Sequence, residues 1–156
     1  MSEDAKFEDG GERPLNLGAM DAEDLKVISS LAQDAVFPIT EMSWLAFDRR
    51  FALLINRFRW EDEGQGRHAP ERVQSVLAVD NVLRVASQGI DRSDKDMILS
   101  LLSVTFEPGE EGAGHVLLTL AGDGAIRLET EALEVTLKDV TRPYKATSGK
   151  VPAHRD

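Results

Sequence analysis

Residues Leu77–Val85 read LAVDNVLRV, and a similar stretch, LAGDGAIRL, follows at Leu120–Leu128. Four of the nine positions are identical, and three more exchange one aliphatic residue for another. In each stretch, alternating apolar residues surround a polar turn, which is the pattern of a β-hairpin. The two stretches therefore predict a β-rich fold in which one kind of hairpin occurs twice.

The segments that precede the two stretches are also alike. Phe51–Glu61 and Met97–Glu107 are apolar runs that end in an aromatic residue and a glutamate, and each leads into an acidic loop that contains glycine. This similarity indicates a strand–loop–hairpin unit that is used twice, as in an internal duplication. Two hairpins can also converge, because alternation around a turn is enough to make one, so both origins stay open.

Pairing across the turns gives each predicted hairpin a core face. With a two-residue turn at Asp80-Asn81, Val79 pairs with Val82, and the core face comprises Val76, Ala78, Leu83 and Val85. With a turn at Asp123-Gly124, the second core face comprises Thr119, Ala121, Ile126 and Leu128. Arg84 and Arg127 then occupy equivalent, less buried positions. They are either ordinary surface arginines or like charges that flank a groove or bind an acidic partner.

Composition limits the class of protein. The 156 residues fit one domain, and the absence of cysteine excludes disulfides, thiolate catalysis and cysteine-based zinc sites. The acidic start carries no secretory signal, and no apolar run approaches the roughly 20 residues of a membrane helix. We therefore expect a cytoplasmic protein that binds no membrane. A net charge of −10 disfavours nucleic acid and anionic lipid as partners.

One helix and a series of strands follow from the local patterns. Asp21 is a good N-cap for a helix over residues 22–33, with Met20 and Leu25 placed as a hydrophobic staple. Strand patterns then run to Leu137, so we expect an α+β, mostly-β fold with about eight or nine antiparallel strands. They would form a curved sheet, a sandwich or a partly open barrel, and a pleckstrin-homology-like arrangement is one option by analogy.

The same patterns divide the chain into three parts. Residues 14–142 are predicted to form a single mostly-β domain. Residues 1–13 mix acids and glycine with few apolar side chains and are predicted to be a disordered acidic tail. Residues 143–156 are polar and are predicted to be a flexible C-terminal tail.

The densest group of candidate binding residues lies around the strand at 51–60. It comprises Arg49, Arg50, Asn56, Arg57, Phe58, Arg59 and Trp60. Arginine beside an aromatic side chain suits base stacking, so single-stranded RNA binding is an alternative function. Alternation, however, places the two arginines at 57 and 59 on one face and the two aromatics on the other. The competing interpretation buries the aromatics in the core and pairs the arginines with acids of the following loop.

Signals for catalysis are weak. The three histidines, His68, His115 and His154, lie far apart, and the sequence contains no HExxH, GxSxG or P-loop motif. The acidic runs also lack the spacing of a calcium loop. We expect no catalytic residue, no metal site and no cofactor. An enzyme of unknown class, the second alternative, would need a pocket that holds His68 or His115 beside a carboxylate.

Several stretches are similar to one known family. They are Arg49–Glu61, Gly124–Glu129, Asp21–Leu25 with Gln33–Val36, and Ser87–Asp91. Over about residues 15–143 the chain resembles a small bacterial family described as domain of unknown function 2948. The resemblance implies a single compact cytoplasmic domain and brings no activity, ligand or catalytic residue with it.

Taken together, these patterns predict a non-catalytic binding or protein-interaction module whose partner is a protein. The oligomeric state cannot be derived from the sequence. The placement of the strand at 51–60 separates the alternatives. Exposed Arg57 and Arg59 beside an exposed aromatic would favour nucleic-acid binding, whereas burial of Phe58 and Trp60 would argue against it.

Overall fold

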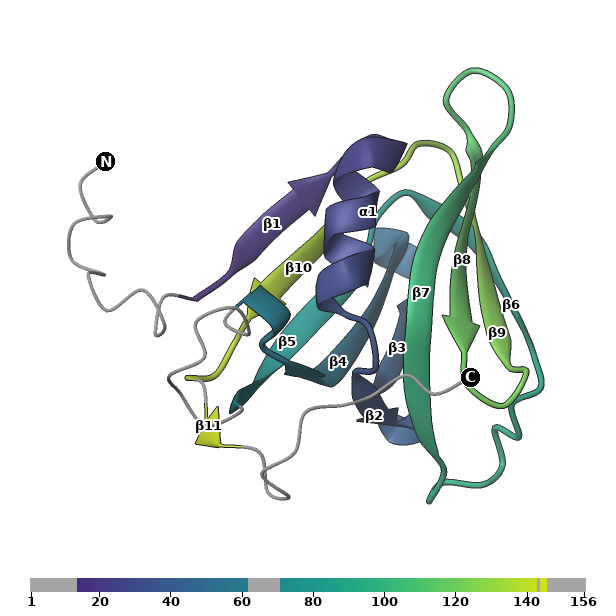
Figure 1. Cartoon of the computed structure of the whole chain (residues 1–156). Coiled ribbons are helices and arrows are strands. Elements are labelled where there is room, and N and C mark those ends of the chain that lie inside the picture. Colours follow the sequence, from purple (N-terminus) through teal and green to yellow (C-terminus); the bar gives the residue numbers. More distant parts are fainter. Residues whose placement is uncertain (1–13, 62–70, 143, 146–156) are drawn as a thin grey trace, which may run out of the picture.

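The computed structural model describes residues 14–61, 71–142 and 144–145 (Figure 1). The described chain has one α-helix, α1 (Ala22–Leu31), and two short 3₁₀ helices, η3 (Ile39–Glu41) and η4 (Ala46–Asp48). Its strands are β1 (Asn16–Ala19), β2 (Val36–Pro38), β3 (Met42–Leu45), β4 (Arg50–Phe58), β5 (Glu71–Val79), β6 (Val82–Gln88), β7 (Ile98–Pro108), β8 (Gly114–Leu120), β9 (Ala125–Thr130), β10 (Val135–Asp139) and β11 (Tyr144–Lys145).

The predicted helix is confirmed, with its start as expected. The Asp21 carboxylate accepts a hydrogen bond of 2.8 Å from the Asp24 backbone N–H, which satisfies one of the free amides of the first turn. Leu25 and Ile28 are buried on the inner face. The helix ends at Leu31, two residues earlier than the pattern predicts, because Ala32 already leaves helical geometry as the C-cap.

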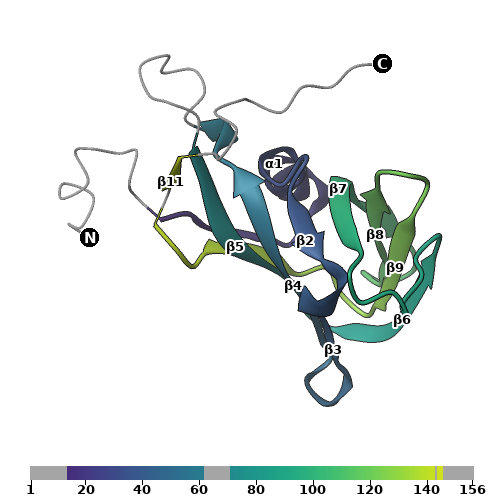
Figure 2. The ribbon, with the colours of Figure 1, turned by 90° about the horizontal axis from the view of Figure 1, so that it is seen from below.

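The strands form one curved, antiparallel sheet that is not closed into a barrel (Figures 1 and 2). Its order is β1-β10-β5-β4-β2-β7-β8-β9-β6, and β3 and β11 add short pairs to β4 and β5. Helix α1 packs between β1 and β7, and the Ser29 hydroxyl accepts a bond from the Val104 N–H at 2.9 Å. The mostly-β fold class is thus confirmed, and the main path has the nine strands at the upper end of the expected range.

The first predicted hairpin does not form. Both edges of β5 are occupied, by β4 and by β10, so that Val79 lies opposite Phe51 and Val135. After Asn81, which adopts a left-handed conformation at φ 62°, the chain crosses to the far end of the sheet, where β6 pairs with β9. Local alternation predicted both strands correctly. However, β10 pairs with the edge of β5 at which the hairpin would have placed β6.

This rearrangement also changes which side chains face the core. Leu77 and Val79 are buried, while Leu83, predicted to be in the core, is exposed. In β6 the register shifts between Val82 and Arg84, so the alternation assumed from a tight turn no longer applies.

The second hairpin forms, with a different register from the predicted one. Ile126 lies opposite Leu118 rather than Ala121, because the turn spans residues 121–124 and is closed by a 2.9 Å bond from the Leu120 N–H to the Gly124 carbonyl. Gly122 and Asp123 both have positive φ within it. The register therefore differs by three residues, an odd number, and the core face holds Leu118 and Leu120 in place of Thr119 and Ala121.

The two predicted tails fall largely on residues that the structure does not describe. The acidic tail at 1–13 lies wholly outside the described residues. Within the segment predicted as a flexible C-terminal tail, Tyr144–Lys145 form β11 and pair with Arg72 and Glu71 of β5. Regular structure thus continues past residue 142.

Candidate functional site

Strand β4 divides the predicted binding cluster between its two ends. Arg49 and Arg50 lie where the strand begins, and Arg57 to Trp60 lie where it finishes. Alternation along β4 is as predicted, since Phe51, Leu53, Ile55 and Arg57 are all buried on one face. The two ends differ in burial and in their neighbours.

A buried ion-pair network surrounds Arg57. Its side chain is 0% exposed, and its Nη2 donates to Asp139 Oδ1 at 3.0 Å. Its Nε donates to the Ser75 hydroxyl at 3.0 Å, and that hydroxyl in turn donates to Asp139 Oδ1 at 2.7 Å. Glu61 accepts two further bonds of 2.9 Å from the guanidinium. All three guanidinium nitrogens of Arg57 therefore donate hydrogen bonds within the protein.

Strand register explains why these residues meet. Ser75 on the central strand β5 lies opposite Ile55 of β4 on one side and Asp139 of β10 on the other. Arg57 is two residues beyond Ile55 on the same face, within reach of both. Asp139 Oδ2 also accepts a 2.8 Å bond from the Leu15 N–H, which ties the start of β1 into the network.

The network shifts the pKa values of two of its members. Burial favours a lower pKa for Arg57, but its hydrogen bonds and attraction to Glu61 and Asp139 outweigh burial and hold that pKa above its usual value. Burial favours a higher pKa for Glu61, but the hydrogen bond and charge of Arg57 outweigh it and lower the pKa. Both groups are therefore charged at neutral pH.

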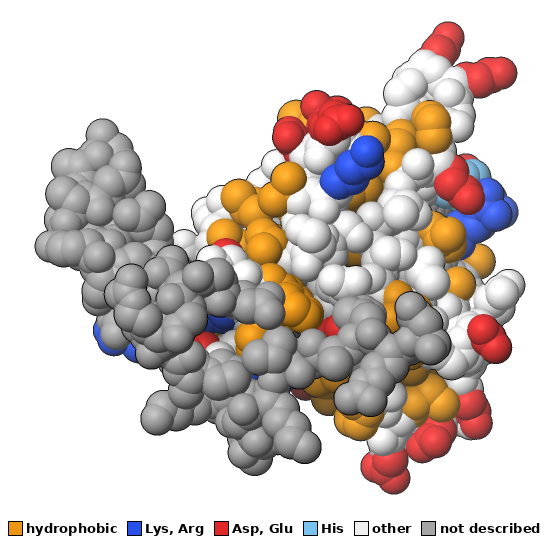
Figure 3. All heavy atoms as spheres, in the orientation of Figure 1, with side chains coloured by type: hydrophobic (Ala, Val, Ile, Leu, Met, Phe, Trp, Pro, Cys, Tyr) orange, Lys and Arg blue, Asp and Glu red, His pale blue; other side chains and the backbone are white. Residues whose placement is uncertain are grey.

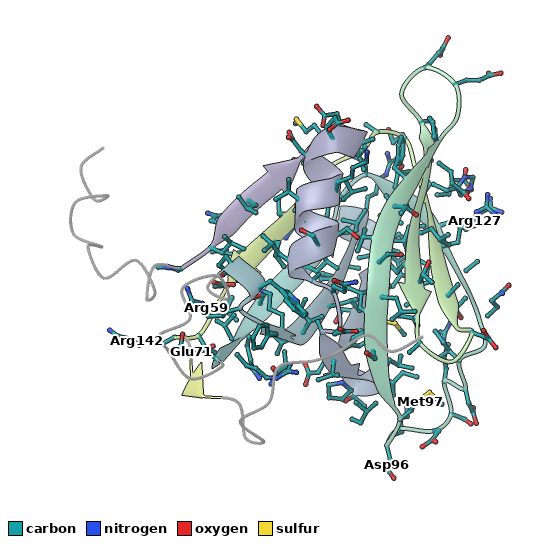
Figure 4. All side chains as sticks on the ribbon, viewed as in Figure 1. Arg59, Glu71, Asp96, Met97, Arg127 and Arg142 are labelled. Atoms are coloured by element: carbon teal, nitrogen blue, oxygen red, sulfur yellow. The ribbon has the colours of Figure 1, made fainter. Side chains whose placement is uncertain are left out.

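The neighbouring side chains at this end are also covered. Arg59 is 3% exposed and donates to Glu71 at 2.6 Å (Figure 4). Phe58 is buried, and Trp60 is half-buried with its ring edge against Phe58 and its indole N–H bonded to the Gln33 carbonyl. Asn56 accepts a bond from Arg72 at 3.2 Å. The structure therefore agrees with the competing interpretation, in which Arg57 and Arg59 pair with acidic residues.

The opposite end of β4 is open to solvent. Arg50 pairs with Asp80 through two bonds of 2.9 and 3.3 Å, and Arg49 pairs with Glu131. Both arginines are exposed, and Arg49 adopts a left-handed conformation as it leaves η4.

This end also carries a group of exposed apolar residues that is not among the predicted binding residues. We call Trp44, Leu45 and Phe47 the β3–β4 tip, after the strands that it joins. Phe47 is 100% exposed, Leu45 is 45% exposed and Trp44 is 37% exposed. Figure 2 shows β3 and the turn that follows it projecting from the sheet. The signal in the sequence is the apolar run Trp44–Phe47 directly before the polar residues Asp48-Arg49-Arg50.

Arg84 and Arg127 lie on one solvent-facing side of the β6–β9 pair. Arg84 is opposite Glu129, and Arg127 is opposite Ala86, so the two arginines are diagonal neighbours. Each is close to a carboxylate, since Arg84 lies 3.6 Å from Glu129 and Arg127 lies 3.1 Å from Glu107. Arg127 is labelled in Figure 4. The two charges are balanced locally.

Of the three histidines, the structure describes His115. His115 lies opposite Glu107 and Glu129 on neighbouring strands, but no group of three or more His, Asp or Glu side chains with metal-binding geometry occurs among the described residues. His68, Arg67 and His154 lie outside the described residues. No described helix is both long and apolar enough to cross a membrane.

Comparison with known proteins places the chain in a family. A family model described as protein of unknown function (DUF2948) matches residues 15–154. No curated protein and no solved structure is significantly similar to the chain. The analogy with pleckstrin-homology domains therefore stays a prediction.

Proposed function

The chain belongs to the DUF2948 family, and we propose that it is a non-catalytic protein-interaction module that binds a partner protein through the β3–β4 tip. The observation that carries the proposal is the full exposure of Phe47 on a projecting turn, beside Leu45 and Trp44. Exposed apolar side chains that cluster are a feature of interaction sites, whereas scattered ones are common on any surface.

The surroundings of the tip suit such a role. Aromatic anchors supply much of the binding energy at protein interfaces when they enter a pocket of the partner. The exposed ion pairs Arg50–Asp80 and Arg49–Glu131 stand at the base of the tip and would form a polar rim. A protein with an apolar groove is the partner that this shape and chemistry favour.

The alternatives receive less support. At residues 57–60 the arginines are buried and paired, so the described residues offer no accessible arginine–aromatic surface for RNA there. Carboxylates also stand at several points of the face in Figure 3, in keeping with the net charge of −10. We further propose a cytoplasmic location, with which a sequence free of cysteine is compatible.

The test is an affinity capture of the full chain from a lysate of its source cells, with and without nuclease. Wild type is compared with Phe47→Ser and with Met20→Ser, which removes an exposed apolar side chain elsewhere. We expect a stoichiometric partner that survives nuclease, persists with Met20→Ser and is lost with Phe47→Ser.

Folding is checked in parallel, because loss of binding must not reflect unfolding. Phe47→Ser is expected to change the free energy of unfolding by less than about 0.5 kcal/mol, since the side chain is fully exposed. A partner retained by Phe47→Ser, or one that disappears with nuclease, would contradict the proposal. Light scattering of both proteins shows whether the partner is a second copy of the chain.

A further inference from the structure

A cavity of about 390 Å³ opens on the surface of the protein. It is lined by Ile39, Thr40, Met42, Arg92 and Lys95. Its volume falls within the range of small-molecule sites, about 300–1,000 Å³. Ile39 is buried and Met42 is half-buried, so they supply an apolar floor, while Thr40, Arg92 and Lys95 are exposed polar groups.

The connection between β6 and β7 holds the two cations on the same side. Asp91 accepts bonds from the Ser93 N–H at 3.1 Å and the Ser93 hydroxyl at 2.6 Å, and the Asp94 N–H donates to the Asp91 carbonyl at 3.1 Å. Asp94 repeats the turn by accepting a 3.1 Å bond from the Asp96 N–H. Arg92 follows Asp91 in the first turn, Lys95 follows Asp94 in the second, and both residues line the cavity.

The connection is fixed to the other wall of the cavity. The Met97 N–H donates to the Asp94 carbonyl at 3.2 Å, and the Ile39 N–H donates to the Met97 carbonyl at 2.9 Å. Figure 4 shows Asp96 and Met97 at the lower end of β7, where this connection joins the sheet. The cationic wall and the apolar floor are thus held together by backbone hydrogen bonds.

The two cations that line the cavity differ in their pairing from the arginines of the strands. Arginines of β4, β6 and β9 have carboxylates within 4.0 Å. Arg92 and Lys95 form no ion pair with any residue in the described part of the chain, and no carboxylate lines the cavity. The carboxylates of Asp91 and Asp94 instead accept hydrogen bonds within their own turns. In a chain with a net charge of −10, two cations are left available to a ligand.

We propose that this cavity binds a small organic carboxylate with a short apolar body. The carboxylate pairs with Arg92 and Lys95, because a guanidinium fork matches its two oxygens. The apolar body lies on Ile39 and Met42, and the Thr40 hydroxyl donates a hydrogen bond to the ligand. The cavity and the β3–β4 tip share no residue.

The first measurement is titration of the full chain with hexanoate, followed by backbone amide shifts in NMR and by calorimetry. Hexanol lacks the charge and inorganic phosphate lacks the apolar body, so each serves as a partial ligand. We expect saturable binding of hexanoate with shifts confined to residues 39–42 and 91–97, and at least about tenfold weaker binding of either partial ligand. Absence of saturable hexanoate binding would overturn the proposal, as would equal binding of phosphate.

A matched pair of double variants tests the assigned residues. Arg92→Gln with Lys95→Gln should weaken hexanoate binding at least about tenfold. Arg84→Gln with Arg127→Gln removes the same charge from exposed ion pairs and should leave binding unchanged. Equal losses in both variants would show attraction to charge in general and refute the site. Phe47→Ser should bind hexanoate normally, which separates this outcome from the test of the β3–β4 tip.

Discussion

The two ends of β4 place the same residue type in opposite surroundings. At one end, Arg57 is 0% exposed and contacts Asp139, Ser75 and Glu61. At the other end, Arg50 is 46% exposed and its side chain pairs with Asp80. Both arginines form carboxylate pairs at about the same distance, 3.0 and 2.9 Å. Distance alone therefore does not distinguish a structural arginine from a surface one.

Solvent decides the difference. Moving a charge out of water costs several kcal/mol, so a buried pair persists only when hydrogen bonds satisfy its remaining atoms, as Ser75 and the Leu15 N–H do for Asp139. An exposed pair gains little, because water screens it. The buried end of β4 therefore stabilises the fold, whereas the exposed end and the β3–β4 tip are accessible from solvent.

The largest expected effect comes from breaking the buried end. Arg57→Met should lower the free energy of unfolding by about 3–5 kcal/mol, because it leaves the Asp139 carboxylate buried without its charged partner. Urea unfolding followed by circular dichroism measures the change. The double variant Arg57→Met with Asp139→Asn should recover part of the loss, since no uncompensated buried charge remains. A single-variant loss below about 1 kcal/mol would contradict the role assigned to the network.

A smaller effect, dependent on pH, is expected at Glu61. Its pKa is lowered in the folded protein, so its contribution to stability is present above its unfolded-state pKa and is lost as pH falls through the folded-state pKa. At pH 7, Glu61→Gln should cost about 1 kcal/mol, because the carboxylate is 26% exposed and partly screened. Urea unfolding of both proteins from pH 7 down to acid should show this gap closing. A gap that widens on acidification would show that the sign is wrong.

The smallest effect is expected at the exposed end. Arg50→Met should change the free energy of unfolding by no more than about 1 kcal/mol, because the Arg50–Asp80 pair is accessible to water. The same urea experiment, repeated at low and high salt, checks it. A loss comparable to that of Arg57→Met would remove the distinction between the two ends.

The repeated unit illustrates how much of the fold was readable in the sequence. Both similar stretches begin with an antiparallel strand pair, β4–β5 and β7–β8, and in each the sequence between the two strands is acidic. Their third strands differ, because β9 returns to β8 whereas β6 leaves β5 and joins β9. Similar local patterns specify similar strands, but the partner of a strand depends on which edges distant segments have already occupied.

The candidate site was predictable to a lesser degree. Sequence proximity grouped Arg49 to Trp60 into one cluster, which the strand in fact spreads over its length. One of the acids that pair with Arg57 is Asp139, which is distant in sequence. The two residues come close because β10 and β4 both pair with β5. The β3–β4 tip is apolar and contains no recognisable binding motif. The cavity is lined by residues 39–42 and by residues 92 and 95, and no sequence pattern indicates that these two segments lie together.

Local sequence specifies the helix with its Asp21 cap, the alternation of β4, the mostly-β class and the net charge, because each depends on neighbouring residues or on composition. Tertiary structure alone decided the pairing of β6 with β9, the burial of Arg57 and the exposure of Phe47. These outcomes depend on desolvation and on competition among distant strands for the same edges, and neither quantity is local in the chain.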